Sequence, residues 1–114
     1  MTSAPQAILM YSTVPDLLVA KRIAHELVEE HLAACVNISA QGLSLYMWQD
    51  SLEGSEEITL TIKTSLYAQQ ACMDKLREMH PYDLPEIIAL PIIGGHPDYI
   101  KWIAQQTRSP ETPL

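Results

Sequence analysis

The stretch HPYDLPE, residues 80–86, decides the fold because it separates two segments of different periodicity. Before it, residues 65–79 predict a helix, since their apolar positions recur at helical spacing. These positions are Ala68, Cys72, Leu76 and Met79. Pro81 ends this helix at the preceding residue, because a residue before proline avoids the helical region. After it, EIIALPII, residues 86–93, predicts a strand in which Pro91 requires an edge or a bulge.

The N-terminal segments show the same order of strand and helix. Residues 7–12 (AILMYS) predict a strand, and residues 16–32 predict a helix. Pro15 and Asp16 suit a helix start, since proline fits the first position and a carboxylate fits the positive end of the helix dipole. The apolar stripe of this helix comprises Ala20, Ile23, Ala24, Leu27, Val28 and Leu32.

The middle of the chain predicts a hairpin. Residues 34–39 and 43–48 read as one long strand with a kink or bulge at Gly42, because an isolated glycine in a strand often marks a bulge. Residues 49–55 are expected to form a polar turn. Residues 56–64 (EEITLTIKT) alternate strictly between polar and apolar side chains, which predicts the second strand.

The order β-α-β-β-α-β is followed by a predicted last helix over residues 96–106. This pattern predicts an α+β fold, the ferredoxin-like sandwich of one antiparallel sheet with two helices on one face. We expect a single domain over residues 1–114 with its core at about 7–106, and a mobile C-terminal tail over residues 107–114. Ser65 is the expected cap of the second helix.

Composition and charge narrow the class of protein. The net charge of −7 over 114 residues argues against nonspecific binding to nucleic acid or to anionic membranes. No apolar run approaches the ~20 residues that a membrane-spanning helix needs, and the first residues do not resemble a signal peptide. Two cysteines in such a chain are expected to be reduced. We therefore predict a cytoplasmic protein without membrane or nucleic-acid partners.

Two helices leave the second face of this sheet uncovered. Leu43, Leu45 and Met47 alternate with Ser44, Tyr46 and Trp48, so both faces of the hairpin carry apolar or aromatic side chains. A last helix of about ten residues is too short to cover a four-stranded sheet. Soluble monomers rarely expose such a patch, which predicts a homo-oligomer.

Five segments in fixed order carry a family resemblance: AACVNI, SLYMW, EEITLTIKT, HPYDLPEIIALP and YIKW. Together they resemble the divalent-cation-tolerance protein family, CutA, from about residue 7 to residue 106. The resemblance implies a ferredoxin-like subunit, a trimer joined through sheet edges, a cytoplasmic setting and a role in tolerance of copper and other divalent cations. The subunits also resemble those of the PII signalling proteins. The family has no firmly established reaction.

The candidate metal ligands are Cys35, His80, Asp83 and Glu86. His80 offers an imidazole that suits copper or zinc, or it only ends the helix and donates a hydrogen bond. Asp83 and Glu86 add carboxylate oxygens, although Glu86 instead has Lys63 as a possible ion-pair partner. Cys35 offers a thiolate, or it is a small buried side chain. On this basis we predict that the protein binds copper or another divalent cation.

A second candidate site is a cleft between subunits that contains Tyr46, Trp48, Lys63 and Tyr82. There Lys63 would bind an anion or pair with Glu86, which gives the alternative function of a PII-like module that binds a small anionic metabolite. A third, weaker alternative is acid–base catalysis by Lys63, His80 and Glu86. The sequence has no nucleophile elbow, phosphate-binding glycine loop or dinucleotide fingerprint, so we predict that the protein is not an enzyme.

Overall fold

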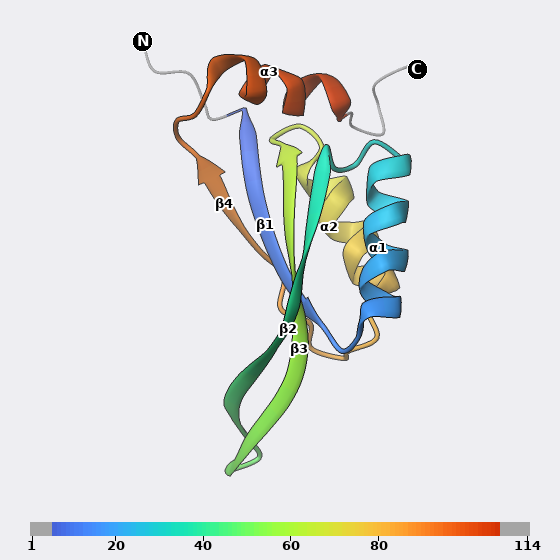
Figure 1. Cartoon of the computed structure of the whole chain (residues 1–114), viewed down its shortest axis with the longest axis vertical. Coiled ribbons are helices and arrows are strands. Elements are labelled where there is room, and N and C mark those ends of the chain that lie inside the picture. Colours follow the sequence, from blue (N-terminus) through green and yellow to red (C-terminus); the bar gives the residue numbers. More distant parts are fainter. Residues whose placement is uncertain (1–5, 108–114) are drawn as a thin grey trace.

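The structure, a computed structural model, describes residues 6–107. In chain order these form β1 (Ala7–Val14), α1 (Leu17–Glu29), β2 (Cys35–Trp48), β3 (Ser51–Ser65), α2 (Gln69–Met79), β4 (Ile88–Ile92) and α3 (Pro97–Gln106). The strands make one antiparallel sheet in the order β2-β3-β1-β4, and α1 and α2 cover one of its faces (Figure 1). This arrangement confirms the predicted α+β fold with a third helix. β4 is an edge strand, which is where Pro91 is tolerated.

The main core lies between the sheet and the first two helices. Side chains alternate between the two faces of a strand, so the even-numbered residues of β1 and β3 point toward the helices. The largest buried side chains of this core are Met10, Ile23, Leu27, Leu60, Ile62 and Leu76. Cys72 is buried among them, and desolvation raises the pKa of its thiol to about 12. Cys72 is therefore an uncharged core residue at neutral pH.

The helices α1 and α2 are both shorter than predicted, because α1 ends before residue 32 and α2 begins after residue 65. Asp16 is the N-cap of α1 and its side chain accepts a hydrogen bond from the Val19 amide at 2.9 Å. The helix ends at Glu29 rather than residue 32, because His31 adopts a left-handed conformation with φ of 60°. The Ser65 hydroxyl does accept a bond from a backbone amide, but residues 66–68 form a turn before α2 begins. Of the two ends of α2, only the C-terminal end agrees with the sequence prediction, since the C-cap is His80, the residue before Pro81.

The β2–β3 hairpin is longer than the sequence suggested and extends well beyond the helices (Figure 1). Gln49 and Asp50 have φ of 49° and 66°, so these two residues alone make the turn, and residues 51–55 pair as strand. The prediction that residues 49–55 form a polar turn was therefore wrong. Polar side chains are tolerated there because this part of the hairpin projects away from the core.

β2 is one continuous strand, as predicted, but its bulge lies between Ile38 and Gln41 and not at Gly42. The Ser39 hydroxyl accepts the hydrogen bond of the Thr59 amide at 2.8 Å, which satisfies a donor that the bulge leaves without a strand partner. Gly42 pairs regularly with Glu57. Because one extra residue reverses the side-chain alternation, the bulge sets which face each later residue of β2 occupies.

The third helix covers one end of the opposite face. Ile103 of α3 is buried against Ala7, which lies on the face that the first two helices leave open, and against Ala34, which precedes β2. Thr107 is the C-cap of this helix, and its hydroxyl bonds to the Ser65 hydroxyl at 2.6 Å. Thr107 is therefore buried, and the prediction that the mobile tail begins at this residue was wrong. The remaining tail, 108–114, lies outside the described residues. Between residues 6 and 107, no helix combines the length and apolarity needed to cross a membrane.

Candidate functional site

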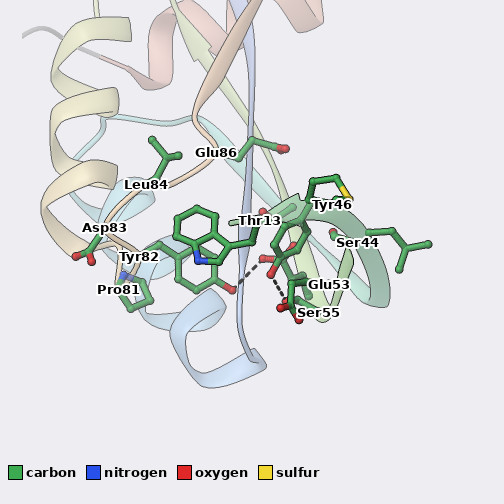
Figure 2. Close-up of a pocket in the computed structure, with 14 residues that line it drawn as sticks. Thr13, Ser44, Tyr46, Glu53, Ser55, Pro81, Tyr82, Asp83, Leu84 and Glu86 are labelled. Carbon is green, nitrogen blue, oxygen red and sulfur yellow. Dashed lines mark hydrogen bonds between the residues drawn. The ribbon is translucent and has the colours of Figure 1, made fainter. Parts of the chain in front are cut away.

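An open groove of about 1060 Å³ lies between the β2–β3 hairpin and the segment 81–86 that follows α2 (Figure 2). Its lining residues are Thr13 of β1, Ser44, Leu45, Tyr46, Met47 and Trp48 of β2, Glu53, Ser55 and Glu57 of β3, and Pro81, Tyr82, Asp83, Leu84 and Glu86. The hairpin thus meets the stretch HPYDLPE, whose Tyr82 was predicted to line a cleft between subunits. The groove forms within one chain.

A hydrogen bond between Tyr82 and Glu57 connects the two walls of the groove. The Tyr82 hydroxyl donates to Glu57 Oε2 at 2.9 Å, and Glu57 is only 9% exposed. Burial, followed by this bond to Glu57, raises the pKa of Tyr82 to about 12, so the phenol stays protonated and donates at neutral pH. Within residues 6–107 the other oxygen of Glu57 has no hydrogen-bond or ion-pair partner.

Strand pairing places two further aromatic side chains on the open face. Tyr46 lies opposite Glu53, and Trp48 lies opposite Ser51, in the same register that places Gly42 opposite Glu57. Tyr46 also shares a hydrogen bond of 2.6 Å with the hydroxyl of Ser55 (Figure 2). The predicted grouping of Tyr46, Trp48 and Tyr82 around one cleft therefore occurs within a single subunit.

His80 is 8% exposed and uses both ring nitrogens within the fold. Its Nδ1 accepts a hydrogen bond from the Tyr82 amide at 3.2 Å, so the ring proton is on Nε2, which lies 2.9 Å from the Thr13 carbonyl oxygen. These bonds attach the start of the segment 81–86 to β1. A metal ion can bind either nitrogen only if one of these hydrogen bonds is broken. The geometry is that of the structural alternative considered for His80.

The other predicted ligands lie in different places. Asp83 and Glu86 line the groove. Cys35 pairs with Lys63 in the register, and Lys63 is four residues from Thr59, the partner of Thr13. Four strand residues correspond to about 13 Å, so Cys35 is remote from His80. In the part of the chain that the structure describes, no three His, Cys, Asp or Glu side chains are grouped to hold a metal ion.

Lys63 does not line the groove. Its Nζ lies 5.6 Å from the centre of the Tyr99 ring, on α3. Lys63 is six residues along β3 from Glu57, which corresponds to about 20 Å. A Lys63–Glu86 pair is therefore not formed within one chain, because the two residues belong to different ends of the sheet.

All the charged side chains that line the groove are acidic. Its lining contains the carboxylates of Glu53, Glu57, Asp83 and Glu86, and none of its lining residues is a lysine, an arginine or a histidine. Such a surface attracts cations and repels anions. Glu53 was not predicted to line a site, because residues 49–55 were expected to form a turn and not a strand. Glu57 lies on the polar side of the alternating stretch 56–64, and that alternation is the sequence signal for its position.

Comparisons with known proteins agree with the fold. The family model described as CutA1 divalent ion tolerance protein matches residues 8–106. The divalent-cation tolerance protein CutA of Pectobacterium atrosepticum is 40% identical over 102 residues, which cover 90% of this chain and 93% of the relative. The crystal structure of the stable protein CutA1 from the psychrotrophic bacterium Shewanella sp. SIB1 has a TM-score of 0.90 and 40% identity, covering 94% of this chain and all of that one.

A second similar structure bears on the cellular compartment. It is described as the periplasmic divalent cation tolerance protein CutA from Archaeoglobus fulgidus, with a TM-score of 0.84 and 35% identity. The alignment covers 88% of this chain and 97% of that protein. Because its description places that protein in the periplasm, the cytoplasmic location of this chain stays a prediction.

Proposed function

Because the chain belongs to the CutA1 divalent ion tolerance family, we propose that it contributes to tolerance of divalent cations, copper among them, by binding the cation at the acidic groove. The observation that supports this proposal most directly is the charge of the groove, whose acidic lining residues Glu53, Glu57, Asp83 and Glu86 are not accompanied by any lysine, arginine or histidine in the lining. Asp83 and Glu86 are the proposed ligands, since carboxylate oxygens bind divalent cations. Water or a second copy of the chain would complete the coordination shell.

His80 and Cys35 are two further candidate ligands for the same cation, and each is tested separately. For His80 to bind copper, the metal must replace the hydrogen bond to Thr13 or to the Tyr82 amide. Cys35 lies away from the groove in one subunit, so its thiolate reaches the cation only from another copy. Imidazole and thiolate ligands both favour copper over magnesium or calcium.

Calorimetric titration with copper(II) tests the proposal. Asp83→Asn combined with Glu86→Gln should weaken copper binding, whereas Glu78→Gln, which removes one carboxylate from α2 outside the groove, should leave it unchanged. His80→Ala and Cys35→Ser are titrated separately, and each reports whether that side chain is a ligand. Equal affinity of the parent protein and the double variant would exclude Asp83 and Glu86 as the site.

The groove gives no support to the alternative of an anionic metabolite. That alternative depended on Lys63 as the cationic contact, and Lys63 lies at the α3 end of the sheet. A phosphate or carboxylate ligand entering the groove would face four carboxylates and no positive side chain. The family name refers to cations, and it assigns no reaction, so the absence of enzymatic activity stays a prediction.

We also propose that the chain forms a homotrimer. The projecting hairpin exposes large apolar side chains on the face continuous with the core, namely Leu43, Leu45, Met47 and Leu52. Leu52 is the most exposed of these four side chains, at 72%. A second copy that covers this surface would remove it from water, and obligate interfaces of this kind commonly bury more than ~2,000 Å². Sedimentation equilibrium at micromolar concentration decides the question, because a folded monomer would contradict the proposal.

The proposed compartment is the cytoplasm. Both cysteines of the chain, Cys35 and Cys72, are free thiols, which suits a reducing environment. Fractionation of cells that produce the protein, with a periplasmic enzyme as marker, tests this. Recovery in the periplasmic fraction would overturn it.

A further inference from the structure

The distal hairpin, defined as residues 41–56 of β2 and β3, is a ribbon of only two strands. β1 pairs with β3 only from Ile58 to Ser65, so between Glu57 and the turn the sheet consists of β2 and β3 alone. This part of the hairpin also extends beyond α1 and α2 (Figure 1). A hairpin of two strands is marginally stable in water unless a third strand or a helix packs against it. One chain therefore provides little support for the distal hairpin.

Burial along the hairpin begins only where the third strand begins. Within residues 41–56, every residue except Ser44 and Ser55 is exposed, whereas from Glu57 onward all residues of β3 are buried or partly buried. The large aliphatic side chains of the distal hairpin are between 63% and 72% exposed, namely Leu43, Leu45, Met47 and Leu52. Apolar burial, which stabilises the core, thus contributes little to the distal hairpin in one chain.

The turn of the hairpin has an unfavourable sequence. Gln49 and Asp50 have φ of 49° and 66°, and a turn with two positive φ values favours Asn-Gly, because positive φ is uncommon for other residues. Two exposed side-chain hydrogen bonds cross the distal hairpin, from Gln41 at 3.3 Å and from Tyr46 at 2.6 Å. Exposed hydrogen bonds compete with water and add little net stability.

The boundary between the core sheet and the distal hairpin is marked on both strands. On β3, the Tyr82 hydroxyl donates to Glu57 at 2.9 Å and attaches the base of the hairpin to the segment 81–86. On β2, the bulge between Ile38 and Gln41 interrupts the regular pairing just before the hairpin. Regions with few buried apolar contacts open at a lower free energy than the core, so this boundary separates two units of different stability.

A second copy of the chain fits the exposed hairpin in both polarity and charge. Ile88 and Leu90 of the edge strand β4 are 50% and 44% exposed, so each copy has apolar surface to offer. The distal hairpin contains three acidic side chains and no basic one. Lys63, in contrast, has no carboxylate partner among residues 6–107. Contact between the hairpin of one copy and the sheet of another would cover apolar surface and bring opposite charges together.

We infer, on the basis of the proposed homotrimer, that the distal hairpin is ordered only where a second copy covers it. The groove is then complete only in the assembled protein. The hairpin supplies Tyr46, Trp48 and Glu53 to the lining of the groove. The opposite wall, segment 81–86, is attached to β1 by the hydrogen bond of His80 to the Thr13 carbonyl oxygen. A lone chain would keep this wall and lose the wall that the hairpin forms.

Hydrogen–deuterium exchange of the full-length protein, followed by mass spectrometry in buffer that contains EDTA, tests this coupling independently of any metal. In the assembled parent protein, peptides from residues 41–56 should exchange slowly, as those of β1 do. In Leu52→Glu, which should dissociate the trimer, the same peptides should exchange at least about tenfold faster while those of β1 stay protected. Gln49→Glu adds the same charge at the exposed turn and is the matched control, which should keep both the mass and the slow exchange of the parent.

A further variant separates the loss of the second copy from local damage by the new charge. Gln49→Asn combined with Asp50→Gly gives the turn the residues that its two positive φ values favour. In the Leu52→Glu background, these two changes should slow the exchange of the distal hairpin without restoring the mass of the trimer. The reason is that a hairpin with a better turn needs less support from a second copy.

Four results would overturn the coupling of hairpin order to assembly. The first is a dissociated Leu52→Glu protein whose hairpin stays protected, which would show that the hairpin supports itself. The second is loss of protection in the hairpin and β1 together, and the third is fast exchange of the hairpin in the assembled parent. The fourth is an unchanged mass of Leu52→Glu. A trimeric parent with a self-supporting hairpin would refute the coupling alone, whereas a parent that sediments as a folded monomer would refute the homotrimer.

Discussion

Replacing His80 with alanine distinguishes its two roles. The change removes the hydrogen bond from Nε2 to the Thr13 carbonyl oxygen and the one that Nδ1 accepts from the Tyr82 amide. It also removes a ring that is 8% exposed and lies 4.9 Å from the ring of Tyr82. If His80 is structural, the loss should appear in the stability of the fold. If it is a metal ligand, the loss should appear in copper affinity.

The size of the stability loss follows from these contacts. Each hydrogen bond contributes about 1 kcal/mol net, and leaving a buried partner unsatisfied costs about 1–3 kcal/mol. The Thr13 carbonyl and the Tyr82 amide both lose a partner, so His80→Ala should lower the free energy of unfolding by about 2–4 kcal/mol. The matched control is His25→Ala. The side chain of His25 is 76% exposed and contacts Glu29 at 3.1 Å, and such surface contacts contribute about 0–1 kcal/mol.

Urea unfolding followed by circular dichroism measures both variants, at one protomer concentration because assembly shifts apparent stability. A copper titration of the same samples measures affinity. A loss below about 0.5 kcal/mol for His80→Ala would refute the structural reasoning, since surface substitutions alone have effects of that size. A stable variant that no longer binds copper would assign His80 as a ligand instead.

Three further predictions concern the groove, the cysteines and the hairpin. Absorbance titration of the tyrosines should show one phenol ionising near pH 12, absent from Tyr82→Phe; since the pKa of Tyr82 is raised, its contribution to stability should be lost as the pH rises from about 10 to about 12. A thiol reagent at pH 8 should label Cys35 in the folded protein and Cys72 only after unfolding, and equal rates would contradict the burial of Cys72. Leu52→Glu should dissociate the proposed trimer in sedimentation experiments, and an unchanged mass would place Leu52 outside the interface.

Local chemistry in the sequence was sufficient for most of the secondary structure. Pro81 ends α2 wherever that helix packs, because the ring restricts the preceding residue. Asp16 caps α1 through a bond to an amide three residues away, which depends only on nearby backbone. The alternation of residues 56–64 fixes which side chains of β3 enter the core, since a strand has two faces whatever its partner is.

The strand register and the groove depended on contacts between distant segments. Residues 51–55 have no apolar alternation, yet they form strand because β2 supplies their hydrogen-bond partners. The bulge places the Ser39 hydroxyl against the backbone amide of Thr59 on the neighbouring strand, so it has no purely local signal.

The groove shows the same division between sequence and tertiary structure. The sequence by itself determined that Tyr82, Asp83 and Glu86 lie together on one rigid segment, because two prolines restrict its backbone. Only the tertiary structure brought Glu57 to Tyr82, across 25 residues, and kept Lys63 away at the α3 end. Because the strands pair in a fixed register, the position of a residue along its strand decides how far that residue lies from the groove. This position depends on the register of the whole sheet. The sign of the charge in the groove is therefore a property of the fold and not of any one segment.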